Sequence, residues 1–179
     1  MNHKSVIPIF FACDNQFVKY TVVSLYSIMC NASTKYNYKI HILHMDIGSE
    51  LQEKIRSMSN ERVEICFVEV KEYLDAISER LPIRDYYSKT TYYRMFIAEM
   101  FPEYEKAIYI DSDTIVLGDI SELYHKELGE NYVAAAHEQV MLQEDTYGQY
   151  VEKVLGIERN NYFNAGILLI NCNAFRENK

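Results

Sequence analysis

Asp111 and Asp113 are the side chains whose type and spacing most directly suggest chemistry, with Ser112 between them. They follow the apolar run 107–110, which predicts a short buried strand. If that strand continued, both carboxylates would point to one face and Ser112 to the other. Two hard oxygen ligands suit Mn²⁺ or Mg²⁺, which also bind phosphate oxygens. A cation held there against a diphosphate would stabilise the leaving group as a Lewis acid.

Two other interpretations of the triplet stay open. Asp and Ser are common in turns, so the triplet alone could simply end a strand. The metal interpretation is favoured because two adjacent carboxylates repel each other without a cation nearby. Phosphatases of the haloacid dehalogenase class also carry a D-x-D at a strand end, but they favour Thr or Val where this chain has Ile115. The chain also lacks the later G-D-x-x-x-D segment that supplies the acidic pair of that class, since Gly118-Asp119 follows the triplet too soon to play that part. This hypothesis therefore ranks second among enzymes.

The composition predicts one folded domain with an acidic surface. Of the 179 residues, 49% are hydrophobic, which is enough to bury a core. The net charge of -8 argues against nucleic acid as a partner, because such binding relies on attraction to phosphates. The four cysteines form no C-x-x-C pair and predict reduced thiols in the cytoplasm. The apolar run 6–12 is too short to cross a bilayer, so no transmembrane segment is expected.

Alternating strands and helices are expected to position the triplet. The hydrophobic pattern predicts, in chain order, a strand at 6–12, a helix at 17–30, a strand at 38–45, a helix from 49 to about 59, a strand at 63–70, a helix from about 88 to 100, a strand at 107–110, a helical turn near 121, a strand at 132–136, a helix at 140–155 and a strand at 167–170. This order favours an α/β fold with a mostly parallel sheet. Such sheets bind ligands beyond the carboxyl ends of their strands. His41 and His44 are expected to be core histidines.

Four blocks of sequence resemble glycosyltransferase family 8 in order and spacing. These retaining enzymes include bacterial lipopolysaccharide galactosyl- and glucosyltransferases. The blocks are IFFACDN at 9–15, TTYYR at 90–94, YIDSDTIV at 109–116 and YFNAGILLIN at 162–171. The resemblance implies a GT-A type fold, with a Rossmann-like, mostly parallel mixed sheet flanked by helices. It also implies that residues 1–179 form a single nucleotide-sugar-binding domain, truncated at its C-terminal side.

The resemblance further implies the contacts of a UDP-sugar donor. Asp14 would accept the N3–H of uracil. Phe17 would stack on the base, although a core aromatic residue at the start of a helix is equally compatible with the sequence. Arg94 would reach the sugar or phosphate, and a surface ion pair is the alternative. The donor contacts implied are Ala12, Asp14, Asn15, Gln16, Phe17, Arg94, Asp111, Ser112, Ala165 and Gly166.

Three residues are assigned catalytic roles by the same resemblance: Arg94, Glu138 and Asn164. Glu138 stands where the family usually has an Asp in contact with sugar hydroxyls. Asn164 would place its amide against the donor sugar, followed by the close-approaching backbone of Gly166. Gly166 could equally serve a tight turn before the last strand.

The family's third metal ligand, a downstream His, has no counterpart before Lys179. The basic tail by which bacterial members attach to membranes would also lie beyond that residue. Two hypotheses of different class therefore stay open. In the first, the chain belongs to an enzyme that moves a hexose from a UDP-sugar to a saccharide or lipopolysaccharide-type acceptor, with Mn²⁺ or Mg²⁺ on Asp111 and Asp113. In the second, it is a UDP-sugar-binding module without turnover.

Overall fold

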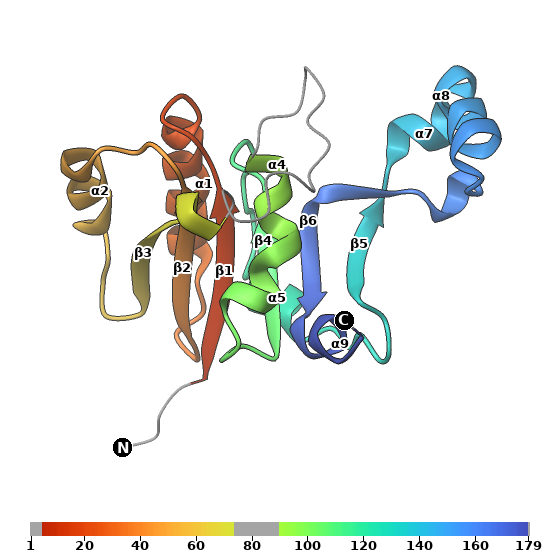
Figure 1. Cartoon of the computed structure of the whole chain (residues 1–179). Helices are drawn as coiled ribbons and strands as arrows, with labels where there is room; N and C mark the ends of the chain where they lie inside the picture. The colour runs from red at the N-terminus through yellow and green to blue at the C-terminus, as the bar shows by residue number, and fades with distance from the viewer. Residues whose placement is uncertain (1–4, 74–89, 179) are drawn as a thin grey trace.

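One mixed sheet organises the computed structural model, which describes residues 5–73 and 90–178 (Figure 1). Within these residues six strands lie in the order β3-β2-β1-β4-β6-β5. The strands β1 (Val6–Ala12), β2 (Asn37–His44), β3 (Val63–Glu69) and β4 (Lys106–Ile110) pair in parallel. β6 (Phe163–Asn171) runs antiparallel to both β4 and β5 (Val133–His137). The predicted mostly parallel α/β sheet is confirmed.

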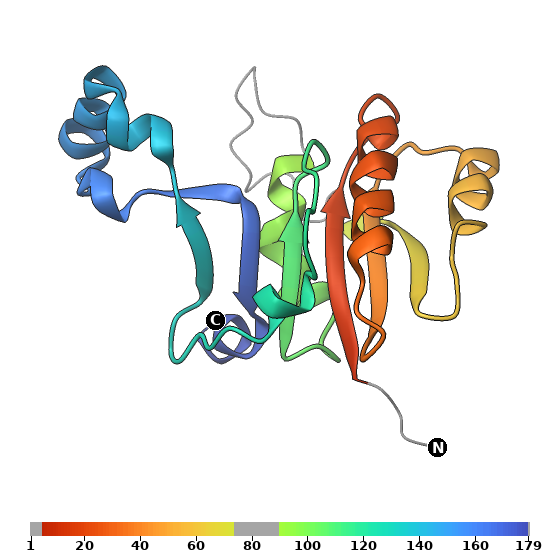
Figure 2. The same cartoon turned by 180° about the vertical axis from the view of Figure 1, so that it is seen from behind.

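Helices cover both faces of the sheet. Helix α1 (Val18–Asn31) lies in front of the sheet in Figure 2, whereas α4 (Thr90–Tyr93) and α5 (Ile97–Met100) lie in front of it in Figure 1. Three further helices are each shorter than α1: α2 (Ser49–Arg56), α6 (Ser121–Tyr124) and α9 (Cys172–Glu177). No helix in the described part of the chain is long and apolar enough to cross a membrane.

Alternation along the central strands creates two cores. Ile9 of β1 and Ile108 of β4 belong to the buried cluster that includes Leu25 of α1. Phe10 and Tyr109 belong to the other cluster, together with residues of α4 and α5. Because side chains alternate along a strand, each core strand is apolar on both faces, which is why these strands appear as continuous apolar runs.

Two predicted helices differ from the structure because they are interrupted. Ser88 lies outside the described residues, and the described part of that helix contains a 3-10 turn (η2, Arg94–Phe96) between α4 and α5. The helix predicted at 140–155 divides into α7 (Gln139–Gln143), α8 (Asp145–Tyr150) and a π turn (η3, Val151–Leu155), with Glu144 extended at the break. These pieces stand away from the sheet beyond β5 (Figure 1).

The last strand is longer than predicted. β6 begins at Phe163, where the first residues are largely exposed, so the apolar run 167–170 marks only its buried part. The exposed part pairs with β5 through Phe163 and His137, after an irregularity in the ladder. Helix α9 was not predicted. The bounds of β1, β2, β3 and β5 were predicted within one residue.

His41 and His44 are buried at 4% and 3% exposure, which confirms that they are core histidines. The His41 ring stacks on Phe10 with centroids 4.7 Å apart, and its Nε2 lies 2.9 Å from the hydroxyl of Tyr104. Burial lowers the pKa of His41 to about 4, and the positive charge of Lys39 adds to this effect. The folded protein therefore holds His41 neutral.

We predict that the free energy of unfolding falls as the pH drops from about 6.5 to 4, because the unfolded chain takes up a proton that folded His41 resists. The slope due to His41 is at most about 1.4 kcal/mol per pH unit. Urea denaturation at several pH values should show this slope reduced in His41→Phe. A control that removes an exposed histidine, His125→Gln, should retain it. Equal slopes in both variants would contradict the assignment.

Candidate functional site

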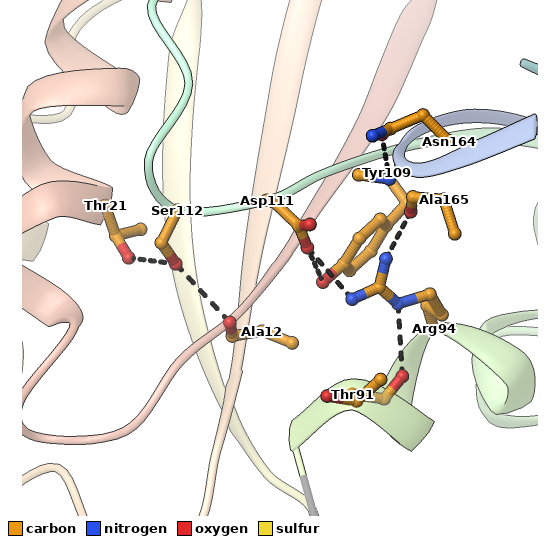
Figure 3. Close-up of polar contacts among 10 residues, drawn as sticks. Ala12, Thr21, Thr91, Arg94, Tyr109, Asp111, Ser112, Asn164 and Ala165 are labelled. Atoms are coloured by element: carbon orange, nitrogen blue, oxygen red, sulfur yellow. Dashed lines mark hydrogen bonds and ion pairs between the residues drawn. The ribbon is translucent and has the colours of Figure 1, made fainter. Parts of the chain in front are cut away.

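Polar side chains converge beyond the carboxyl ends of β1 and β4, next to β6 (Figure 3). Two adjoining hollows share Thr91, Arg94 and Asp111. The smaller has a volume of about 200 Å³, and its lining includes Ala12, Asp14, Phe17, Ser112 and Asp113. The larger has a volume of about 710 Å³, and its lining includes Glu138, Tyr162, Phe163, Asn164, Ala165 and Gly166. The structure thus brings together most of the residues that the sequence singled out.

Asp111 lies just after β4, because the strand ends at Ile110 and residues 112 and 113 form a turn. The condition under which both carboxylates share a strand face is therefore not met, although Asp111 and Asp113 still line the same hollow. The Asp111 Oδ1 accepts hydrogen bonds from the hydroxyl of Tyr109 at 2.7 Å and from Arg94 Nη2 at 2.9 Å. Its backbone N–H donates to the Gly166 carbonyl at 2.7 Å.

Arg94 makes contacts that join three elements. Its Nε donates to the Thr91 carbonyl at 3.1 Å, its Nη1 to the Ala165 carbonyl and its Nη2 to Asp111. The guanidinium also lies over the Tyr109 ring, 4.3 Å from the centroid. Arg94 therefore provides the counter-charge for Asp111, and the repulsion expected between the two aspartates is already reduced without a cation. The alternative of an ion pair is met in part, since Arg94 pairs with Asp111. The pair is partly buried rather than on the surface, because the Arg94 side chain is only 14% exposed.

Tyr109 is a site residue that the sequence analysis missed. It is 1% exposed and lies in an apolar strand, so its pattern is that of a core residue. Burial raises the pKa of its hydroxyl well above the ordinary value, the negative charge of Asp111 raises it further, and the charge of Arg94 opposes the change. The hydroxyl is therefore a donor at neutral pH. The available signal was its spacing, since Tyr109 and Asp111 stand two residues apart.

Asn164 and Glu138 are held against each other. Asn164 Nδ2 donates to Glu138 Oε2 at 2.7 Å, and its Oδ1 accepts from the Gly166 N–H at 2.8 Å. Glu138 Oε1 accepts from the Val140 N–H at 3.2 Å and so caps the start of α7. Both side chains line the larger hollow with their polar groups oriented by these contacts.

Gly166 lies within β6, which rules out the alternative of a turn before the strand. A Cβ atom at this position would lie 2.8 Å from Asp111 Oδ2 and 2.9 Å from Asn164 Oδ1. Both distances are shorter than carbon and oxygen atoms tolerate without a bond. Gly166 therefore allows the close approach of the Asp111 carboxylate to β6.

The loop between β1 and α1 is organised by Asp14. Its Oδ1 accepts from the backbone N–H groups of Gln16 and Phe17, both at 2.9 Å. Phe17 is 48% exposed and borders the smaller hollow, so the alternative of a core aromatic residue is wrong. Asn15 and Gln16 are exposed and line neither hollow.

Ser112 points into the protein, away from Asp111 (Figure 3). Its hydroxyl accepts from Thr21 of α1 at 2.9 Å and donates to the Ala12 carbonyl at 3.4 Å. Ser112 is 7% exposed. Its side chain therefore fixes the acidic turn to α1 and β1, and this contact uses its hydroxyl internally.

The two carboxylates fit a cation whose remaining ligands come from a bound substrate. Residues 5–73 and 90–178 contain no group of three or more His, Cys, Asp or Glu side chains arranged to hold a metal ion. Mg²⁺-like ions, however, are commonly bound by one or two carboxylates together with substrate phosphates. Asp111 and Asp113 supply that number of ligands, and Asp113 forms no hydrogen bond or ion pair with any described residue.

The fold and this site define a GT-A type glycosyltransferase domain. The apo structure of the bifunctional glycosyltransferase WbbM superposes with a TM-score of 0.82 and 27% identity, over 99% of this chain and 33% of that one. The galactosyltransferase LgtC, solved with donor and acceptor sugar analogues, superposes with a TM-score of 0.76 and 24% identity, over 97% of this chain and 60% of that one. The GT-A expectation for the fold is confirmed.

The family model of Glycosyl transferase family 8 matches residues 8–179, and the chain belongs to this family. A Haemophilus influenzae relative is 33% identical over 94% of this chain, and glycosyltransferase GlyE of Streptococcus pneumoniae is 31% identical over 90%. The chain spans 49% and 34% of the length of these two proteins. Family membership sets aside the phosphatase hypothesis.

We predict that Gly166→Ala displaces the Asp111 carboxylate and breaks its contact with Arg94, because the added Cβ would overlap Asp111 Oδ2. Such overpacking should lower the free energy of unfolding by about 1 to 3 kcal/mol. Urea denaturation provides the measurement. Gly118→Ala is the matched control, since a Cβ there meets no atom within 4 Å. Equal stability of the two variants would show that the close approach is not a constraint.

Proposed function

We propose that this chain forms the part of a retaining glycosyltransferase that binds the sugar donor. The enzyme would move a hexose from a UDP-sugar to a saccharide acceptor and would depend on Mn²⁺ or Mg²⁺. The observation that carries the proposal is the Asp111 and Asp113 turn beside Arg94, at the meeting point of two hollows. Family membership supports sugar transfer. Retention of configuration and a lipopolysaccharide-type acceptor rest on the family resemblance alone.

The smaller hollow is proposed to hold the uridine. Phe17 offers a half-exposed ring on which a base can stack. The Oδ1 of Asp14 is occupied by two backbone amides, which leaves Oδ2 to accept the N3–H of uracil. The diphosphate would then lie towards Asp111 and Asp113, which line the same hollow.

The larger hollow is proposed to hold the hexose and part of the acceptor. Its volume of about 710 Å³ lies in the range typical of small-molecule sites. Glu138 and Asn164 face it with a carboxylate and an amide that can bind sugar hydroxyls. Because these side chains orient each other, their geometry is preorganised for a polar ligand.

A divalent cation would stabilise the charge that develops on the diphosphate leaving group. Asp111 and Asp113 would hold that cation. Arg94 stands beside them and can pair with an anionic oxygen of the donor through its planar donors. A cytoplasmic location is part of the proposal, since Cys13, Cys30, Cys66 and Cys172 are free thiols.

A UDP-sugar-binding module without turnover is the second candidate. It is favoured by the fact that the described residues supply two carboxylates at this site and no cluster of three metal ligands. The two candidates differ in one measurement. Release of UDP from UDP-galactose or UDP-glucose with Mn²⁺ present supports the enzyme, whereas Mn²⁺-dependent UDP binding without release supports the module.

We predict that UDP binding requires Mn²⁺ and that Asp113→Asn weakens it by at least about 10-fold, since a carboxylate ligand is lost. Calorimetric titration of UDP with and without Mn²⁺ measures this. The thermal midpoint of Asp113→Asn should stay unchanged, because Asp113 is exposed and unpaired among the described residues. Asp111→Asn should weaken binding and also lower the midpoint, because Arg94 loses its counter-charge.

The control for charge is Glu103→Gln. Glu103 is exposed and precedes the start of β4, whereas the site lies at the end of that strand. It removes the same charge and should leave UDP binding unchanged. Absence of Mn²⁺-dependent heat with the unmodified protein would overturn the proposed function. If Asp113→Asn and Glu103→Gln bound UDP with equal affinity, Asp113 would not be part of the binding site.

A further inference from the structure

Tyr109 places a buried hydroxyl against the acidic turn. The residue is 1% exposed and packs in the core cluster that contains residues of α4 and α5. A buried hydroxyl requires a hydrogen-bond partner. Its partner is not a backbone carbonyl of the core but Asp111 Oδ1, at 2.7 Å.

The two oxygens of Asp111 have different surroundings. Oδ1 accepts from both Tyr109 and Arg94, whereas Oδ2 accepts no hydrogen bond from any described residue. Oδ2 lies over Gly166, in the space that a Cβ atom would fill. Two donors on one oxygen restrict rotation of the carboxylate and leave the other oxygen available to a ligand.

Of the two hydrogen bonds to Asp111 Oδ1, the one from the Tyr109 hydroxyl would persist during ligand binding. Arg94 can exchange its contact with Asp111 for one with a phosphate of the UDP-sugar, because its side chain is long and carries several N–H groups. Tyr109 cannot follow, since its ring is fixed within β4 and covered by the core. Its ring also lies under the Arg94 guanidinium, at 4.3 Å from the centroid.

We infer that Tyr109 is a positioning residue of the donor site, whose hydroxyl orients the Asp111 carboxylate so that Oδ2 is offered to the cation. This inference rests on the proposed function for the identity of the cation. Hydrogen-bond partners of metal ligands commonly change metal affinity by about 10- to 100-fold when they are removed. The effect of Tyr109 is expected in that range.

The test is Tyr109→Phe, which removes the hydroxyl but keeps the ring under Arg94. Mn²⁺ is titrated by calorimetry into protein saturated with UDP, and thermal midpoints are recorded in parallel. The matched control is Tyr38→Phe. Tyr38 is also 1% exposed, and its hydroxyl donates to the Asp119 carboxylate at 3.0 Å, outside both hollows.

We expect Tyr109→Phe to weaken Mn²⁺ binding by at least about 10-fold, whereas Tyr38→Phe should change only the thermal midpoint. If both variants lose thermal stability and bind Mn²⁺ like the unmodified protein, Tyr109 is only structural and the inference fails. If the unmodified protein binds no Mn²⁺ with UDP, the proposed function fails instead. In that case a crystal structure of Tyr109→Phe still tests whether Tyr109 orients Asp111. An Asp111 carboxylate in the same orientation as in the unmodified protein would refute that role.

Discussion

The ion pair between Arg94 and Asp111 is the interaction on which the site depends. Three segments distant in sequence meet there, because Arg94 follows α4, Asp111 follows β4 and the Ala165 carbonyl belongs to β6. The charge of Asp111 is thereby compensated inside a partly buried pocket, where an unpaired carboxylate would be costly. The same pair lies between the two hollows, so the shape of the hollows and the packing of these elements have a common origin.

Side chains alternate between the two faces of β4, which explains how one short segment contributes both to the site and to the packing of the helices. Tyr109 lies on the side of α4 and α5, and Asp111 contacts Arg94 from the same helical segment. Ser112 turns to the opposite side and bonds to Thr21 of α1. Even beyond the last ladder pair, Asp111 and Ser112 are therefore anchored to different layers. Asp113, the first residue without such an anchor, is the one left open to a ligand.

Sequence reasoning recovered what depends on local pattern. The core strands were predicted because β1 and β4 are apolar on both faces, and the acidic turn because Asp111 follows directly after such a strand. It did not recover what depends on partners distant in sequence. The pairing of Arg94 with Asp111 and the role of Tyr109 require knowledge of which face meets α4. The exposed start of β6 was missed for a related reason, since pairing rather than burial makes it a strand.

Charge balance links the two ligands of the proposed site. In the structure, the positive charge of Arg94 offsets the negative charge of Asp111. A divalent cation on Asp111 would therefore meet a like charge, which by itself disfavours its binding. A diphosphate would relieve that conflict, because its negative charge would be compensated by the guanidinium and by the cation together. The arrangement thus favours joint binding of cation and nucleotide, because Arg94 lies beside the acidic turn and can pair with the diphosphate when the cation takes Asp111.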